Sequence, residues 1–176
     1  MNQERSEEES PEVETREDAA KGVRALILDD DEWALRLIRY VLEESLPGVQ
    51  VETRETPEAE NGFDIYVVDN DFGGASRATE VVGKIRAQEP ESLVVAFSAT
   101  LDRATLKSLL NAGCDAAFEK GRPNDLEELS RVARSHAEKV SRGGPRGVIA
   151  SIRAIRDLIH EWNVRLDREE VGVHGK

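Results

Sequence analysis

Polar residues that could bind a metal ion and a phosphoryl group follow four of the apolar runs in this sequence. The first of these runs is followed by three acids, Asp29, Asp30 and Asp31, and the second by Asp69, Asn70 and Asp71. The third is followed by the hydroxyl of Ser98 and the fourth by the ammonium of Lys120. Carboxylates gathered at one place repel each other unless a cation lies among them, and an all-oxygen set of ligands suits Mg²⁺. A hydroxyl and an ammonium facing such a cluster would neutralise an incoming phosphoryl group. These residue types therefore indicate phosphoryl chemistry, provided that the fold brings them together.

The apolar runs have the length and composition of buried strands. Strands are predicted at residues 23–28, 49–53, 63–69, 92–97 and 115–119. Apolar residues of helical period predict helices at residues 32–46, 76–88, 101–112 and 124–140, while residues 55–62 offer only about a turn of helix. Gly113 is typical of a helix C-cap, and Asn124 with Glu127 resembles a capping box. Strands that alternate with helices predict an α/β fold with a doubly wound, five-stranded parallel sheet, in which ligands bind beyond the carboxyl ends of the strands.

Composition excludes several classes of function. The 176 residues include 36 acidic and 24 basic side chains, a formal net charge of -12. This balance repels phosphate backbones and anionic lipid surfaces, so we expect neither nucleic-acid nor membrane binding. A single cysteine excludes an internal disulfide framework. Because no apolar run approaches the roughly 20 residues of a membrane span and no signal-peptide pattern is present, we expect a cytoplasmic protein.

The segments on either side of residues 23–140 have a different composition. Residues 1–22 are acidic and almost without large apolar side chains, so we expect a disordered tail. Residues 141–147 form a Gly/Pro linker, residues 148–170 a C-terminal extension helix, and residues 171–176 a second disordered tail. A seam of apolar residues at heptad spacing runs along the extension helix: Val148, Ile152, Ile155, Ile159, Trp162 and Leu166. The seam could pair with a second copy in a homodimer, enter the groove of a partner, or dock back on the folded domain.

The order and spacing of the four polar motifs resemble those of the receiver domain of bacterial two-component response regulators, of the stand-alone, CheY-like kind. The resemblance covers residues 23–140. It rests on an acidic pair in ILDDD, an acceptor in DIYVVDND, a hydroxyl before a small residue in AFSAT, and a lysine after GCDAAFE: Asp29 and Asp30, Asp69, Ser98 and Ala99, and Lys120. It implies a flavodoxin-like receiver fold and an aspartyl-phosphate switch.

In such a switch Asp69 would be the nucleophile that accepts a phosphoryl group from a sensor histidine kinase or a phosphotransfer protein. The resemblance implies that Asp30, Asp69 and the backbone carbonyl of Asp71 bind Mg²⁺, with Asp29 assisting. The new charge would then change the surface that a downstream protein target binds. The domain would promote only phosphotransfer and dephosphorylation at Asp69, so we expect no enzyme in the turnover sense.

The same resemblance gives Ser98 and Lys120 contacts with the phosphoryl oxygens and makes Ala99 a modulatory position. Asp71, two residues after the acceptor, is expected to influence the lifetime of the phosphoryl group. Ala117 stands where the family has an aromatic residue, and Phe118 is expected to face the other side of its strand.

Three further expectations concern the loops and the runner-up functions. Gly73 and Gly74 predict a mobile loop after the acceptor, and Trp33 is expected to pack over the acidic loop. A pseudo-receiver that binds proteins without phosphorylation is the main alternative, because these loop residues depart from the family pattern. A phosphatase of the haloacid-dehalogenase type is a further alternative, with Asp69 as nucleophile and Asp71 as acid and base, but there the metal-binding acids follow these motifs.

Overall fold

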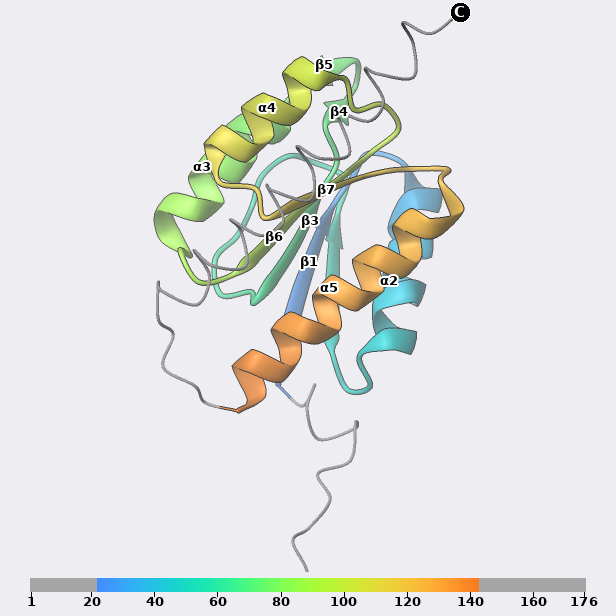
Figure 1. Cartoon of the computed structure of the whole chain (residues 1–176), viewed down its shortest axis with the longest axis vertical. Coiled ribbons are helices and arrows are strands. Elements are labelled where there is room, and N and C mark those ends of the chain that lie inside the picture. Colours follow the sequence, from blue (N-terminus) through green and yellow to red (C-terminus); the bar gives the residue numbers. More distant parts are fainter. Residues whose placement is uncertain (1–21, 143–176) are drawn as a thin grey trace, which may run out of the picture.

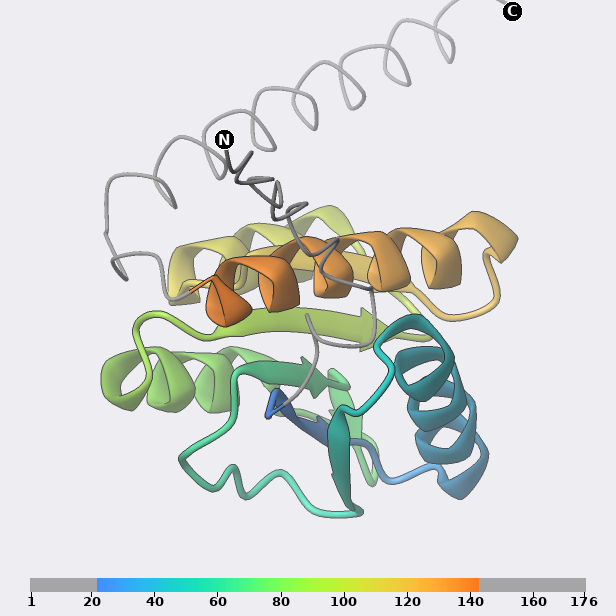
Figure 2. The ribbon, with the colours of Figure 1, turned by 90° about the horizontal axis from the view of Figure 1, so that it is seen from below.

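The computed structural model of the protein describes residues 22–142 of the chain. Five strands form one parallel sheet in the order β2-β1-β3-β6-β7: β1 (Arg24–Leu28), β2 (Gln50–Arg54), β3 (Ile65–Val68), β6 (Leu93–Ser98) and β7 (Ala116–Glu119). Three helices connect strands of the sheet, α2 (Glu32–Ser45), α3 (Ala78–Gln88) and α4 (Arg103–Ala112), and α5 (Pro123–Ser141) follows the last strand. Helices α2 and α5 cover one face of the sheet, α3 and α4 the other (Figure 1), and the layers are seen from below in Figure 2. The predicted doubly wound, five-stranded parallel sheet is confirmed.

The two faces of the sheet carry two separate cores because successive strand residues point to opposite sides. In β1, Ala25 and Ile27 join the core beneath α2 and α5, whereas Leu26 and Leu28 join the core beneath α3 and α4. All four side chains are buried. A strand covered on both faces needs an unbroken apolar run, which is why the central strands were recognisable in the sequence.

Helix ends follow local chemistry. Asp31 caps α2, its carboxylate accepting a hydrogen bond of 2.9 Å from the N–H of Trp33. Asp102 caps α4 in the same way, at 2.7 Å from the N–H of Thr105. Helix α4 ends at Gly113, whose φ of 101° is the left-handed conformation that favours glycine, as predicted.

Two local predictions were wrong, and one local element was not predicted. The capping box does not form, since α5 has Arg122 as its N-cap residue and no side-chain cap. The side chain of Asp125 instead accepts a hydrogen bond of 2.7 Å from the N–H of Glu119 and ties the helix to β7. Residues 55–62 contain no helix. The loop after β3 folds into a small antiparallel ribbon, β4 (Asp71–Phe72) and β5 (Ala75–Ser76), that the sequence reading did not include.

The predicted N-terminal tail lies outside the described residues except for Gly22, and so do the extension helix 148–170 and the C-terminal tail. Of the predicted linker only residues 141 and 142 are described, and α5 includes the first of them. None of the described helices is long and apolar enough to span a lipid bilayer.

Candidate functional site

Three acidic side chains meet at the carboxyl edge of the sheet, as the sequence predicted. Asp29 follows β1 and Asp69 follows β3, and both are almost fully buried, with 1% and 4% of their surface exposed. Asp30, next to Asp29, is exposed. One carboxylate oxygen from each of the three lies within 4.8 Å of the others.

Backbone hydrogen bonds hold these residues in place. β1 and β3 are adjacent, and Leu28 lies beside Val68 in their register. Just beyond that pair, the N–H of Asp69 donates to the carbonyl of Leu28 at 2.8 Å, and the N–H of Asp29 donates to the carbonyl of Arg54 at 3.1 Å. The carboxylates therefore start from the rigid ends of hydrogen-bonded strands, so their separation does not depend on a free loop.

Lys120 brings a positive charge to the same point from the end of β7. Its Nζ lies 2.6 Å from Oδ2 of Asp29 and 3.2 Å from Oδ1 of Asp69. Its backbone N–H donates to the carbonyl of Ser98 at 2.7 Å, which fixes the turn that aims the side chain inward. One ammonium thus contacts two of the three carboxylates, and the cluster keeps a negative balance.

Burial and charge act against each other in this cluster. Burial is the largest influence on the pKa of Asp29 and raises it, while the close contact with Lys120 only partly opposes the rise. Burial by itself lowers the pKa of Lys120, but the contact with Asp29 and the charge of Asp69 outweigh it, so the pKa of Lys120 is raised. The ammonium therefore stays charged, and the desolvated carboxylate of Asp29 gains from any further cation.

The oxygen atoms of the cluster fit a divalent cation. Oδ2 of Asp29 and Oδ1 of Asp69 are buried and receive no well-directed hydrogen bond, so Lys120 serves them as an ion pair only. Mg²⁺ prefers oxygen ligands, and carboxylate oxygens with unused lone pairs are suited to bind it. Asp71 donates its backbone N–H to Oδ2 of Asp69 at 3.1 Å, and its exposed side chain accepts a hydrogen bond of 2.8 Å from Gly74.

The ribbon after β3 supplies contacts that the sequence reading missed. The carboxylate of Asp30 accepts a hydrogen bond of 2.7 Å from the N–H of Gly73, at the turn of the ribbon. Asn70 accepts a hydrogen bond of 2.9 Å from the hydroxyl of Ser76, and its carbonyl accepts one of 2.9 Å from Arg77. Gly73 and Gly74 have φ of 61° and 84°, which a two-residue hairpin turn requires. The Gly-Gly pair was therefore a turn signal rather than only a sign of mobility.

The remaining predicted residues lie at the same edge. Ser98 is buried at the end of β6, and Ala99 after it is exposed.

Ala117 packs into the core beneath α3 and α4, whereas Phe118 packs against the core beneath α2 and α5, so the two face opposite sides as expected. Trp33 does not pack over the acidic loop: its side chain is 76% exposed, with the guanidinium of Arg36 5.5 Å from its ring centre.

Comparison with solved structures identifies the fold. A CheY-like response regulator receiver domain from Methanospirillum hungatei JF-1 shares 26% identity and a TM-score of 0.57 over 67% of this chain and 98% of its own. This part of the chain has the fold of a response regulator receiver domain. The BeF₃-activated receiver domain of DrrB from Thermotoga maritima has 24% identity and a TM-score of 0.55, over 66% of this chain and 97% of its own.

Another structure with the same fold was solved with Mg²⁺. The response regulator TrrA from Thermotoga maritima, solved in complex with Mg²⁺ and a beryllium fluoride, has 23% identity and a TM-score of 0.52, over 63% of this chain and 98% of its own. Neither a protein-family model nor a curated protein matches the sequence. The described receiver spans nearly the whole length of these structural relatives, so the likeness extends over complete receiver domains.

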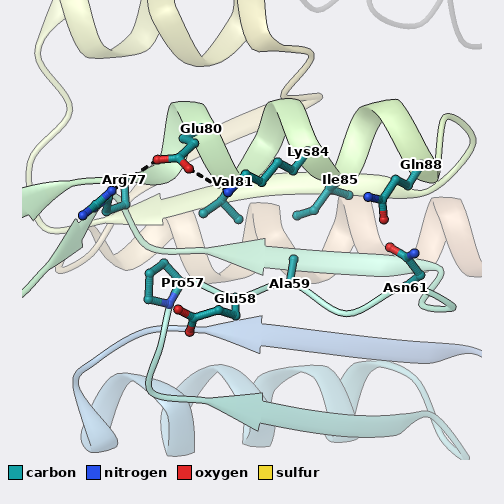
Figure 3. A pocket seen from close by; sticks show the side chains of 10 residues that line it. All are labelled: Pro57, Glu58, Ala59, Asn61, Arg77, Glu80, Val81, Lys84, Ile85 and Gln88. Atoms are coloured by element: carbon teal, nitrogen blue, oxygen red, sulfur yellow. Dashed lines mark hydrogen bonds and ion pairs between the residues drawn. The ribbon is translucent and has the colours of Figure 1, made fainter.

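A pocket of about 300 Å³ lies apart from the acidic cluster, between the loop that precedes β3 and the outer side of α3 (Figure 3). None of its lining residues belongs to the cluster. Its charged side chains already neutralise one another, because Glu80 pairs with Lys84 at 2.6 Å and with Arg77 at 3.3 Å. This pocket therefore offers no concentration of unpaired charge comparable with the acidic cluster at the carboxyl edge of the sheet.

Proposed function

We propose that this receiver is a phosphorylation-dependent switch of a two-component phosphorelay, in which Asp69 accepts a phosphoryl group from the phosphohistidine of a sensor kinase or phosphotransfer protein. The observation that carries the proposal is the position of Lys120 Nζ, 2.6 Å from Asp29 and 3.2 Å from Asp69. A half-buried ammonium beside a buried carboxylate is arranged to receive a further negative group rather than to bind a neutral ligand.

Asp69 is the nucleophile of the transfer. A carboxylate oxygen of Asp69 forms a bond to phosphorus while the phosphorus–nitrogen bond of the donor breaks, and the imidazole keeps the electron pair and takes a proton from solvent. Lys120 then neutralises part of the added charge, and the hydroxyl of Ser98 donates to a phosphoryl oxygen. Ala99, small and exposed, leaves that side of the phosphoryl group open.

Asp29, Asp30 and Asp69, with the backbone carbonyl of Asp71, would hold Mg²⁺, which neutralises phosphoryl oxygens in transfers of this kind. Two buried oxygens without directed hydrogen bonds support this assignment. The carboxylate of Asp71 stands two residues from the acceptor and sets the lifetime of the acyl phosphate by orienting water. The output is binding of a downstream protein in the cytoplasm, so the receiver turns over no substrate.

Intact-mass measurement tests the proposal. The protein is incubated with phosphoramidate, a small donor with the same phosphorus–nitrogen bond, with and without Mg²⁺. We expect a mass gain of one phosphoryl group that needs Mg²⁺ and is absent in Asp69→Asn. Asp71→Asn is the matched control: it keeps the gain, and its rate of loss differs from that of wild type.

Other outcomes favour the alternatives. No gain that depends on Asp69, in a protein that binds Mg²⁺, would leave a pseudo-receiver that signals by constitutive contacts. The phosphatase alternative would be favoured if the protein hydrolysed a small phosphate ester repeatedly and both Asp69→Asn and Asp71→Asn lost this activity.

A further inference from the structure

The exposed large apolar side chains of the described residues all lie on α2. Trp33, Leu37 and Tyr40 are 76%, 46% and 62% exposed. Their spacing of four and three residues places them in one stripe, and the buried residues of the helix, such as Ile38, lie on the opposite side. Single exposed apolar residues are ordinary, but a contiguous stripe on one helix indicates a binding surface.

The same chain contains a segment with the complementary pattern. In residues 148–166 six apolar residues repeat at intervals of four and three, and this segment lies outside the described residues. A helix of about 19 residues with one apolar seam is marginal alone in water and is stabilised by packing that seam against another helix. We infer that this segment docks on the stripe of Trp33, Leu37 and Tyr40 within the same molecule, antiparallel to α2.

The connection has the necessary reach. α2 and α5 pack side by side and both end at the amino edge of the sheet, the lower end of the view in Figure 1. The six residues that follow Arg142, as far as Val148, can span about 20 Å, against about 10 Å between the axes of packed helices. From there a 19-residue helix is about 28 Å long, and α2, with 14 residues, about 21 Å. The segment can therefore run back along α2 as far as Trp33.

Charge favours this orientation. α2 ends with the exposed acids Glu43 and Glu44 and has no basic residue in its last turn, where its dipole is also negative. The first charged residues of the segment are Arg153 and Arg156, and Arg156 flanks the seam. An antiparallel helix brings this basic half close to the acidic end of α2.

The size of the stripe favours an intramolecular partner over a second copy. Three side chains of this kind bury about 500 Å² in all, less than the roughly 800 Å² that each partner contributes to a standard interface. A segment joined through a short linker is present at a millimolar effective concentration and needs no larger contact. Trp33 is in the first turn of α2, three residues after Asp30, so a segment docked as far as Trp33 would end near the acidic site.

Disulfide trapping in the full chain tests the inference. Leu37→Cys is combined with Ile155→Cys or with Ile159→Cys, and the matched control pairs Leu37→Cys with Asp157→Cys, on the far side of the segment. Cys114 does not interfere, because it is buried and burial raises its pKa to about 12. We expect a disulfide within one chain for at least one seam variant, formed at least tenfold faster than in the control and independent of protein concentration.

Two results would overturn the inference that this segment docks on α2. Cross-linked dimers that increase with concentration would assign the stripe to a second copy, and equal trapping in seam and control variants would mean that the segment does not dock there.

A fluorescence measurement gives an independent readout. Trp162→Phe leaves Trp33 as the single tryptophan of the chain. Adding Ile152→Asp and Ile159→Asp breaks the seam without touching the described domain. We expect the emission of Trp33 to shift to longer wavelength, because water reaches the ring. An unchanged spectrum contradicts docking on this stripe, and equal urea midpoints show that the fold is intact in both variants.

Discussion

The carboxylate of Asp30 accepts a hydrogen bond of 2.7 Å from the backbone N–H of Gly73, 43 residues further along the chain. This bond joins the loop after β1 to the turn of the ribbon after β3, and so links the exposed acid of the cluster to the segment that follows the acceptor. The turn depends on Gly73, whose φ of 61° is unfavourable for residues with a side chain.

Gly73→Ala should lower the free energy of unfolding by about 1 kcal/mol, because alanine is strained at positive φ. A Cβ at Gly73 would meet no atom within 4 Å, so strain and not a clash is the cause. Gly83→Ala is the control: it has equally open space but lies inside α3, and should stabilise the protein by up to about 1 kcal/mol. Urea unfolding of both variants measures the difference, and a change of the same sign would contradict this account.

Lys120→Met should destabilise the metal-free protein by about 2 kcal/mol, because Asp29 and Asp69 lose the ammonium that neutralises them. Mg²⁺ should then raise the unfolding midpoint of the variant more than that of wild type, since binding to the folded state alone stabilises it. Lys84→Met removes an ammonium from an exposed pair with Glu80, and should change stability by less than about 0.5 kcal/mol. Equal responses of wild type and Lys120→Met to Mg²⁺ would mean that cation and lysine do not share these carboxylates.

Arg86→Lys should destabilise the protein by about 2 kcal/mol although the charge is kept. The guanidinium donates to three carbonyls and a carboxylate at the amino edge of the sheet: those of Gly113, Pro90, Ser92 and Asp115. An ammonium cannot reproduce this fork of donors and leaves acceptors unpaired. Arg36→Lys, in an exposed pair on α2, is the control. Thermal unfolding compares the two, and a similarly small effect of both would show that the network contributes little.

Stability should fall on acidification below about pH 6.5 because of His136 on α5. Burial lowers its pKa, although the carboxylates of Asp115 and Asp64 partly oppose this, and its Nε2 is buried without a hydrogen-bond partner. A group whose pKa is lower in the folded state binds its proton more readily in the unfolded state, so stability is full above the unfolded pKa and lost as pH falls through the folded one.

His136→Gln should therefore lose less stability than wild type between pH 7.5 and 5.5, in urea midpoints. Asp29, whose pKa is raised, contributes in the opposite direction but equally in both proteins, so it cancels in the comparison. Parallel pH curves would contradict the role of His136.

The sequence alone was sufficient for the framework of the fold and for the identity of the polar cluster. Strands such as 23–28 and 63–69 are buried on both faces, so their apolar runs are visible without a structure. Because parallel strands end at one edge, Asp29, Asp69 and Lys120 could be expected together before any distance was known.

Only the tertiary structure decided what depends on contacts between distant residues. Gly73 meets Asp30 because the ribbon folds back, and Arg86 donates to four acceptors in two segments, residues 90–92 and 113–115; neither contact leaves a local pattern. The capping box failed because Asp125 bonds to Glu119 instead, a local preference overridden by a tertiary partner. Trp33 is exposed because its helix is rotated by burial of Ile38 and Leu42 beneath it. The residues of the polar cluster could be recognised from short stretches of sequence, whereas the conformation of the loops and surfaces around them depends on tertiary packing.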